Sequence, residues 1–409
     1  MLVSFMLKNF RSFKEPAMLS LLPVQRLTGE EHLNETHLMR TDHPKYGRLL
    51  RSAAIYGANA SGKTNLLKGL TAMQDFVLSN LTDIRPVKNF PLTPFAFSEE
   101  TVHAPVSMEV QTLQAGRLYR YGFEVTPKSV VTEWLYCDEK PMFEREGQEF
   151  DLEPSFHEGQ GKETQTRDNA LFLSVCHSYN GPVSGLIVKG LFEKIYCDSP
   201  FSAELPFTRL TNDYFKDPQI EDLMKHMIRL ADPGIESLQK RWIGKGESDL
   251  LQPFTIDALH SCEGVHNKLD IKELSAGTLK WINIASLICY AMINGGIIVI
   301  DEIDIQLHPH LIDTLLTIFH SEFQKPVQLI FTTHNTYPLR QKSLRRDQVW
   351  FVNKLSDLSS ELVNFSETKV RTDGSYEKDY LNGRYSGVPQ IDLPEIPGVY
   401  MKEGSISKA

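Results

Sequence analysis

Short apolar runs bounded by polar or turn-forming residues recur along the chain and predict strands. Residues 2–7 form the first run and residues 18–24 the second. Residues 53–56 are short and apolar, residues 297–300 are apolar throughout, and residues 327–331 are apolar except for Gln328. Continuous apolar strands of this kind belong to parallel sheets that are covered on both faces, so the pattern predicts a buried parallel sheet.

Apolar residues at helical spacing predict helices in three further segments. Residues 220–235 carry a mixed helical pattern, and a helix is expected from residue 309 to about residue 322. No heptad register is sustained, so a long coiled coil is not expected. The first of the three helices follows residues 53–56 and a polar loop, with Leu66, Leu67, Leu70, Met73, Phe76 and Val77 on its apolar face.

Alternation of apolar and polar positions predicts an antiparallel sheet in a different part of the chain. Residues 106–125 alternate on both sides of Ala115 and Gly116, which is the pattern of a β-hairpin. Residues 130–136 and 142–143 would extend this sheet.

Residues 281–300 carry no charge and are long enough in principle to span a membrane. Gly295 and Gly296 interrupt this segment, and Asp301 and Glu302 follow it at once. A buried helix followed by a buried strand explains the pattern better, so no membrane span is expected.

Composition narrows the class of protein. With 409 residues, of which 41% are hydrophobic, the chain can form two or three domains, or one large domain with an inserted lobe. The net charge of −9 argues against a surface coated in basic residues but allows a local basic patch that contacts nucleic acid. The five cysteines are scattered, and the N-terminal residues lack a signal-peptide pattern, so we expect reduced thiols in a cytoplasmic protein.

Residues 57–64 read GANASGKT and match the complete phosphate-loop pattern G-x-x-x-x-G-K-[ST] between an expected strand and an expected helix. In such a loop, backbone N–H groups and the helix N-terminus face phosphate oxygens. Lys63 is expected to reach the β- and γ-phosphates, and Thr64 to hold Mg²⁺ through its hydroxyl. The expected nucleotide-binding residues of the loop are Gly57, Asn59, Ala60, Ser61, Gly62, Lys63 and Thr64.

Two carboxylates follow the apolar strand at residues 297–300, at the end of a parallel strand where ligands bind. We therefore expect Asp301 to orient Mg²⁺, usually through water, and Glu302 to polarise an attacking water. His334 follows the next buried strand, and by itself it would be read as a structural histidine. Its position after Asp301 and Glu302 favours a histidine that senses a γ-phosphate or holds the water.

Ser275 and Gly277 stand just before an apolar-rich helix. A serine followed by small residues at a helix start can present N–H groups to an anion, so both residues are candidate contacts to the nucleotide.

These motifs in this order resemble the ABC-type ATPase heads of the RecF and SMC kind. Residues 9–13 (NFRSF) are similar to the first-strand motif of that group, residues 57–64 to Walker A, residues 274–278 (LSAGT) to the signature motif, residues 297–302 to Walker B, residues 304–308 to the D-loop, and His334 to the switch histidine. The runs at residues 347–351 (DQVWF) and 380–385 (YLNGRY) are closer to stand-alone bacterial ATPases such as RloA. Those ATPases are often paired with a nuclease or another effector in phage defence.

The resemblance implies an α/β fold, namely an ABC-ATPase-like head with a P-loop parallel-sheet core, an antiparallel β subdomain and an inserted, mainly helical lobe. It places the two halves of the head in residues 1–170 and 251–409, and the lobe in residues 171–250. It also implies ATP hydrolysis with ATP and Mg²⁺ as cofactors. Glu302, His334 and Lys63 would then be the catalytic residues, and Thr64 and Asp301 the metal ligands.

The resemblance further implies a homodimer or higher oligomer in which two heads sandwich two ATP molecules. Ser275 and Gly277 of one subunit would cap the γ-phosphate held by Lys63 of the other. Such a switch would control a partner effector, such as a nuclease, in bacterial antiphage defence.

Two other functions stay open. The chain could be a RecF-like DNA-repair ATPase that acts directly on DNA, or a scaffold that binds ATP but barely hydrolyses it. The signature reads Ser-Ala-Gly-Thr rather than the Ser-Gly-Gly-Gln of transporter ATPases, which favours the RecF/SMC side. The Q-loop residue cannot be placed from the sequence.

Two weaker patterns each allow two interpretations. His260, Cys262 and His266 are either strand and turn residues or, less favoured, zinc ligands without a second pair nearby. The basic stretch at residues 340–346 either contacts phosphate backbones or a partner, or forms a solvated helix face.

Overall fold

A core sheet with the strand order β11-β15-β16-β5-β17-β18 organises the protein. The computed structural model describes residues 1–25, 27, 30–82, 92–198, 217–242, 254–321, 325–341, 343–368 and 375–385. Within those residues, β11, β15, β16, β5 and β17 run parallel and β18 runs antiparallel to β17. The strands are β5 (Ser52–Gly57), β11 (Ile195–Asp198), β15 (Gly296–Ile300), β16 (Val327–Thr332), β17 (Val349–Lys354) and β18 (Ser360–Asn364).

Both faces of the core sheet are buried, which explains why its central strands are largely apolar. Along β15, Ile297 and Val299 join a hydrophobic cluster shared with α2 (Lys63–Thr82). Ile298 and Ile300 point the other way, into a cluster shared with α8 (Ala276–Asn294) and α9 (Pro309–Phe319). Successive side chains of a strand face opposite sides of a sheet, so one apolar run supplies two cores. The predicted buried parallel sheet is confirmed.

An antiparallel sheet with the order β10-β9-β8-β7-β6-β1-β2 lies against the α2 side of the core. Gln114 and Arg117 close the predicted hairpin, and the predicted strands after it extend the sheet. Its strands are β1 (Leu2–Lys8), β2 (Ala17–Ser20), β6 (Val106–Gln114), β7 (Arg117–Val125), β8 (Val130–Cys137), β9 (Lys140–Glu146) and β10 (Glu149–Leu152).

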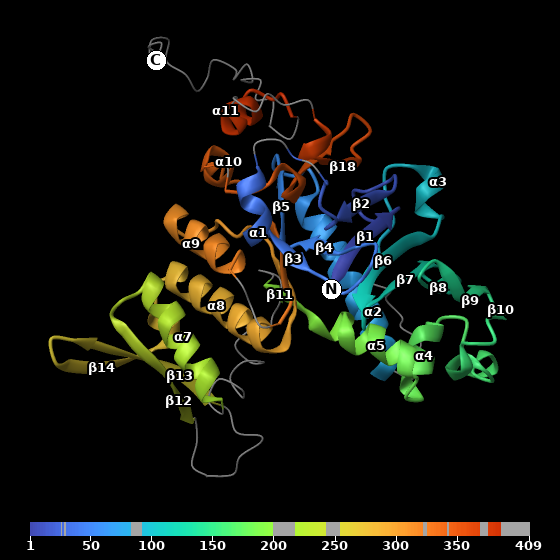
Figure 1. The fold of residues 1–409 in the computed structure, drawn as a ribbon, viewed down its shortest axis with the longest axis horizontal. Helices are drawn as coiled ribbons and strands as arrows, with labels where there is room; N and C mark the ends of the chain where they lie inside the picture. The colour runs from blue at the N-terminus through green and yellow to red at the C-terminus, as the bar shows by residue number, and fades with distance from the viewer. Residues whose placement is uncertain are drawn as a thin grey trace, which may run out of the picture.

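The two sheets meet near the start of the chain and share one core. The Gln328 side chain accepts a hydrogen bond from Leu2 N at 2.8 Å and donates one to Leu2 O at 2.9 Å, which ties β16 to β1. Helices α4 (Phe172–Ser178) and α5 (Pro182–Gly190) cover the inner face of β7–β9, and Figure 1 shows them on the opposite side of the molecule from α8 and α9. The result is a layered α/β architecture, as expected.

A smaller module flanks α8 at the other end of the molecule (Figure 1). It contains α7 (Pro218–Ala231) and a sheet of β12 (Ile235–Trp242), β13 (Phe254–Cys262) and β14 (Val265–Asp270). Trp281 Nε1 donates to Met227 O at 2.6 Å and anchors α7 on α8. The described part of the expected helical lobe therefore contributes β11 to the core sheet and β12 to this module, while its boundary at residue 250 lies outside the described residues. The three-part domain division stays an expectation.

Short elements complete the described fold. They are α1 (Asn34–His37), α3 (Glu99–Val102), α10 (Tyr337–Gln341) and α11 (Tyr376–Leu381), the strands β3 (Leu38–Arg40) and β4 (Arg48–Leu50), and the 3₁₀ turns η1 (Glu31–Leu33), η2 (His157–Gly159), η3 (Glu163–Gln165), η4 (Phe192–Lys194), η5 (Ile271–Glu273), η6 (Arg346–Gln348) and η7 (Phe365–Glu367).

Helix α8 is long and apolar enough to cross a membrane by length and composition, and half of its most apolar window is buried inside the protein. It packs between α7 and the core sheet and leads directly into β15. The expected buried helix followed by a buried strand is confirmed. Cys137, Cys176 and Cys289 are free, buried thiols, and burial raises the pKa of Cys289 to about 12.

Candidate active site

The phosphate loop connects β5, which ends at Gly57, to α2, which begins at Lys63. Lys63 Nζ donates to Gly57 O at 2.8 Å and to Ala58 O at 3.0 Å, so the ammonium lies across the loop. Burial lowers the pKa of Lys63, whereas the nearby carboxylates Glu302 and Asp301 oppose that shift. Asn59 and Ala60 lie exposed at the loop tip, and Ala60 has a φ of +61°.

The remaining loop residues pack against two distant segments. Ser61 is buried, and Ser61 O accepts a hydrogen bond from Ser360 Oγ of β18. Gly62 has a φ of +114°, and a Cβ there would lie 2.2 Å from Ser360 Oγ and 2.7 Å from Ser12 Oγ. Only glycine fits this position, and the close approach brings the expected first-strand motif, residues 9–13, against the phosphate loop.

Asp301 and Glu302 follow β15 and are held from the neighbouring strand β16. Thr332 Oγ1 donates to Asp301 Oδ1 at 2.6 Å and accepts from Glu302 N at 2.7 Å. Because Thr332 is fully buried and Asp301 nearly so, this hydroxyl fixes both acidic residues at the carboxyl edge of the sheet. The position agrees with the rule that parallel sheets bind ligands at that edge.

His334 follows β16 and lies beside the same acids. Its backbone N–H donates to Asp304 Oδ1 at 3.1 Å. Partial burial and the positive charge of Lys63 lower the pKa of His334, while Asp304, Glu302 and Asp301 oppose that shift. The imidazole is therefore neutral at pH 7 and can accept a proton or a hydrogen bond. The structure thus brings Lys63, Asp301, Glu302, Asp304 and His334 together at the ends of β5, β15 and β16.

Thr64 and Asp301 line one small cavity of about 30 Å³, together with Asp198 at the end of β11. Hydroxyl and carboxylate oxygens are the donors that Mg²⁺ prefers, so the residues present fit a magnesium ion bound with nucleotide phosphates. Lys63 and the N-terminus of α2 fit the phosphates themselves.

The signature residues lie at the start of α8, after the 3₁₀ turn η5. Ser275 caps α8 and accepts from Thr278 N at 3.1 Å. A Cβ on Gly277 would lie 2.6 Å from Gln306 O, so glycine allows the start of α8 to pack on the segment after Glu302. Ser275 is exposed, and its hydrogen bonds stay within the helix start. Within one chain, the signature residues contact the expected D-loop and not Lys63.

Three residues of this region were missed by sequence reasoning. Asp198 follows a short apolar run, which could have predicted another strand ending in a carboxylate. Thr332 gave no signal, because its role depends on the pairing of β15 with β16. Tyr380 of α11 lies in the expected C-terminal motif, and its hydroxyl accepts a hydrogen bond from the Gly57 N–H. Its ring packs 5.8 Å from Tyr56 and stacks 5.4 Å from Phe351, measured between ring centroids.

The two weaker sequence patterns do not form sites in the described residues. His266 lies 3.6 Å from Glu236, and no group of three or more His, Cys, Asp or Glu suited to a metal is found there, although the Cys262 side chain lies outside the described atoms. In the basic stretch, Arg345 pairs with Asp347 at 2.6 Å and Arg346 with Glu30 at 2.9 Å. These two arginines are buried or nearly buried, so they fit neither a phosphate contact nor a solvated face. Arg340 is exposed and lies 4.0 Å from Glu377, and Lys342 lies outside the described residues, so for these two positions both interpretations stay open.

The fold and this cluster of residues define a nucleotide-binding ATPase domain. The sequence profile of the family described as "AAA domain, putative AbiEii toxin, Type IV TA system" matches residues 52–339, which is more than half of the chain and spans the phosphate loop, the acidic pair and His334. The chain belongs to this family of AAA ATPase domains. No curated protein matches the chain.

Solved structures similar to this protein include SMC head domains. An SMC head bound to the C-terminal winged-helix domain of ScpA superposes with a TM-score of 0.50 at 13% identity, covering 88% of this chain and 97% of that one. The SMC head domain from Thermotoga maritima superposes with a TM-score of 0.44 at 15% identity, covering 90% of this chain and 99% of that one. The SMC head domain from Pyrococcus furiosus, with an extended coiled coil and bound to the C-terminal domain of ScpA, superposes with a TM-score of 0.47 at 11% identity. This superposition covers 94% of this chain and 98% of that one. The first of these similarities supports the expected SMC-head or ABC-ATPase-like fold.

Proposed function

We propose that this protein is an ATP-hydrolysing switch whose subunits dimerise around ATP and control a partner effector in bacterial antiphage defence. The convergence of Lys63, Asp301, Glu302 and His334 at one sheet edge carries the proposal. The family description, which names a toxin of toxin–antitoxin systems, supports a defence role. The likeness to RloA rests on residues 347–351 and 380–385 alone.

Each residue has a defined task in this proposal. Lys63 and the α2 N-terminus bind the phosphates, and Thr64 and Asp301 hold Mg²⁺, which supplies charge neutralisation at the transferred phosphoryl group. Glu302 accepts a hydrogen bond from the attacking water, and neutral His334 holds that water or contacts the γ-phosphate. Ser275 is exposed and Gly277 partly exposed at the start of α8, where we propose that they face the nucleotide of a second subunit.

The experiment compares Glu302→Gln with wild type by native mass spectrometry in ATP and Mg²⁺. The variant keeps the shape of the side chain but removes its negative charge, so it should hydrolyse ATP at least about a hundredfold more slowly and accumulate a dimer. Glu153→Gln, at an exposed position outside the site, is the matched control and should behave as wild type. Equal dimer content in wild type and Glu302→Gln would count against the switch.

The same samples separate the other functions. Strong stimulation of ATP turnover by DNA alone would favour a DNA-repair ATPase. Unchanged slow turnover and unchanged assembly in Glu302→Gln would favour a scaffold that binds ATP without using hydrolysis.

A further inference from the structure

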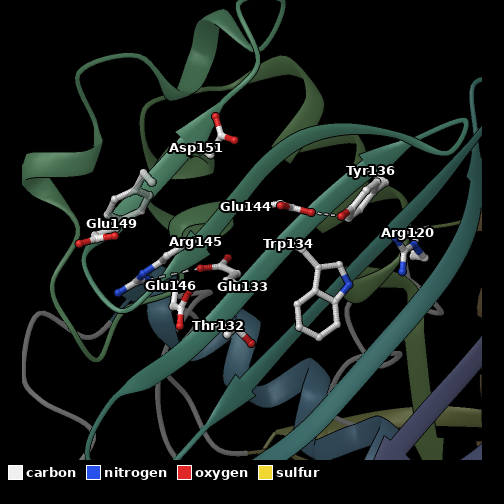
Figure 2. Close-up of a pocket in the computed structure, with 11 residues that line it drawn as sticks. Arg120, Thr132, Glu133, Trp134, Tyr136, Glu144, Arg145, Glu146, Glu149 and Asp151 are labelled. Atoms are coloured by element: carbon white, nitrogen blue, oxygen red, sulfur yellow. Dashed lines mark hydrogen bonds and ion pairs between the residues drawn. The ribbon is translucent and has the colours of Figure 1, made fainter.

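The outer face of the antiparallel sheet carries a pocket of about 490 Å³ over β7–β10, far in sequence from the phosphate loop (Figure 2). Alternation along β8 explains which side chains reach it. Glu133 and Leu135 point inward and are buried, whereas Thr132, Trp134 and Tyr136 point outward and are partly exposed. The pocket is therefore built mainly by the face of the sheet that no helix of the described protein covers, and the inward-facing Glu133, Arg145 and Phe150 complete its lining.

Trp134 forms the floor of this pocket. It lies opposite Gly122 of β7, and a Cβ on Gly122 would come within 2.4 Å of Trp134 Cζ2. The missing side chain at Gly122 lets the indole lie flat across the sheet. Trp134 Nε1 then donates to Glu109 Oε2 on β6 at 2.8 Å, which fixes the orientation of the ring. One face of a rigid, partly exposed indole is presented outward.

The pocket already holds one stacked cation. The Arg120 guanidinium lies 4.0 Å from the centroid of the Tyr136 ring, and its Nη1 is 3.2 Å from Glu109 Oε2. Its charge is therefore compensated within the sheet. The other arginine of the pocket, Arg145, is fully buried and pairs with Glu133 at 3.4 Å. Neither arginine is available to the carboxylates at the rim.

Four exposed carboxylates form that rim, and they face each other in pairs. Glu144 lies directly opposite Asp151, and Glu146 directly opposite Glu149, in the register of β9 and β10. Like charges at directly opposed positions destabilise a sheet. Among the described residues no cation pairs with any of the four, and Glu144 accepts a hydrogen bond only from the Tyr136 hydroxyl. The sheet thus bears an uncompensated repulsion that a cationic ligand would relieve.

The chemistry of the pocket selects among ligands. Phosphate oxygens would be repelled by the four carboxylates, which excludes a nucleic acid backbone from this face. A divalent ion is not favoured at this pocket, because its four rim carboxylates do not form a group of three or more His, Cys, Asp or Glu side chains that could hold a metal ion. An arginine or lysine side chain fits both features, since it can stack on an aromatic ring and pair with a carboxylate.

We propose that this aromatic and acidic pocket is the docking site for an arginine- or lysine-rich segment of a partner protein. A cationic side chain of the partner stacks on the outward face of Trp134, and its neighbours pair with the facing carboxylates of β9 and β10. The site lies outside the nucleotide-binding residues, so docking and ATP hydrolysis can be measured separately.

The test uses the full chain and a labelled hexa-arginine peptide, with hexa-glutamine as the neutral probe, in fluorescence anisotropy at low ionic strength. Hexa-arginine should bind, and Glu146→Gln/Glu149→Gln should weaken it about tenfold, because two charge pairs are lost. The matched control Glu153→Gln/Glu263→Gln removes two exposed carboxylates outside the pocket and should leave the affinity within about twofold. Trp134→Thr, which suits a strand, should also weaken binding.

Thermal denaturation adds an independent readout. Relief of the facing repulsion should raise the Tm of Glu146→Gln/Glu149→Gln by about 1–3 °C while binding is lost, a combination that a folding defect cannot produce. Absence of hexa-arginine binding would overturn the proposal. Equal weakening in both double variants would overturn it too, since only general charge attraction would remain. A self-association that disappears in Glu146→Gln/Glu149→Gln would assign the face to a second copy of this chain instead.

Discussion

Lys280 Nζ lies 3.0 Å from Asp198 Oδ2, in an ion pair that joins the signature helix α8 to the edge strand β11. Both side chains are largely buried. Asp198 O accepts from Asp301 N, and Asp198 lines the cavity shared with Thr64. The orientation of α8 is thereby linked to the expected metal site through one carboxylate.

A double-mutant cycle of Lys280→Met and Asp198→Asn should show a coupling free energy of about 1–3 kcal/mol in chemical denaturation. Each single variant leaves the remaining partner buried without its counter-charge. The double variant removes both charges, so no unpaired charge remains. Only Asp198→Asn should raise the Mg²⁺ concentration needed for half-maximal ATP binding, because Lys280 contributes no oxygen to the cavity. A coupling near zero would mean that the pair does not hold α8.

Thr332→Val should lower the free energy of unfolding by about 2–4 kcal/mol. The valine has the same shape but leaves Asp301 Oδ1 and the Glu302 N–H without their hydrogen-bond partner in a buried position. ATP turnover should fall as well, since both acids lose their anchor. Urea denaturation and phosphate release measure the two effects, and Thr332→Ser, which keeps the hydroxyl, should recover most of both. A Thr332→Ser variant as impaired as Thr332→Val would assign the effect to packing.

Tyr380→Phe should weaken ATP binding about fivefold, the equivalent of about 1 kcal/mol for one lost hydrogen bond. The ring contacts with Tyr56 and Phe351 are kept, but the hydroxyl that accepts from the Gly57 N–H is removed. Calorimetric titration with ATP measures the change. Tyr385→Phe is the matched control. It removes a hydroxyl that donates to Asp379 Oδ2 of α11 at 3.0 Å, and this variant should bind ATP normally. Equal effects of the two variants would contradict a specific role of Tyr380 at the phosphate loop.

Stability should decrease as the pH falls below about 6.5, because two buried histidines stay neutral in the folded protein. The ring centroids of His37 and His320 lie 3.6 Å apart, and His320 Nε2 is 3.0 Å from Ser52 Oγ. Burial lowers the pKa of both below the ordinary value of 6.5, most strongly for His320. The unfolded chain therefore binds protons first as the pH falls. Stability present above pH 6.5 is lost with a slope of up to about 1.4 kcal/mol per pH unit for each histidine.

Urea denaturation between pH 7.5 and pH 5 measures this slope. His320→Gln removes one titrating group and should make the slope shallower, although it also lowers stability at pH 7.5. A slope that is unchanged in His320→Gln would show that other groups govern the acid sensitivity.

Much of the fold could be read from the sequence because local patterns carried it. The mainly apolar runs at residues 53–56, 297–300 and 327–331 became β5, β15 and β16, since a strand buried on both faces favours apolar residues at successive positions. The alternating residues 106–125 became a hairpin because one face of that sheet is exposed. A strand with one exposed face needs apolar residues only at every second position. Residues 57–64 specified a phosphate loop because its glycines and lysine are required by the loop geometry itself.

The tertiary structure decided what no local pattern encodes. The strand order places β11 beside β15, so Asp198 reaches the cavity of Thr64 across more than a hundred residues of chain. Thr332 holds Asp301, and Tyr380 contacts Gly57, only because separate segments fold against one sheet edge. The facing carboxylates of β9 and β10 likewise depend on the pairing register of these two strands, which local sequence patterns do not specify. Sequence alone predicted most of the candidate site residues of this protein, whereas long-range pairing determined which of them meet and added residues such as Asp198 and Thr332.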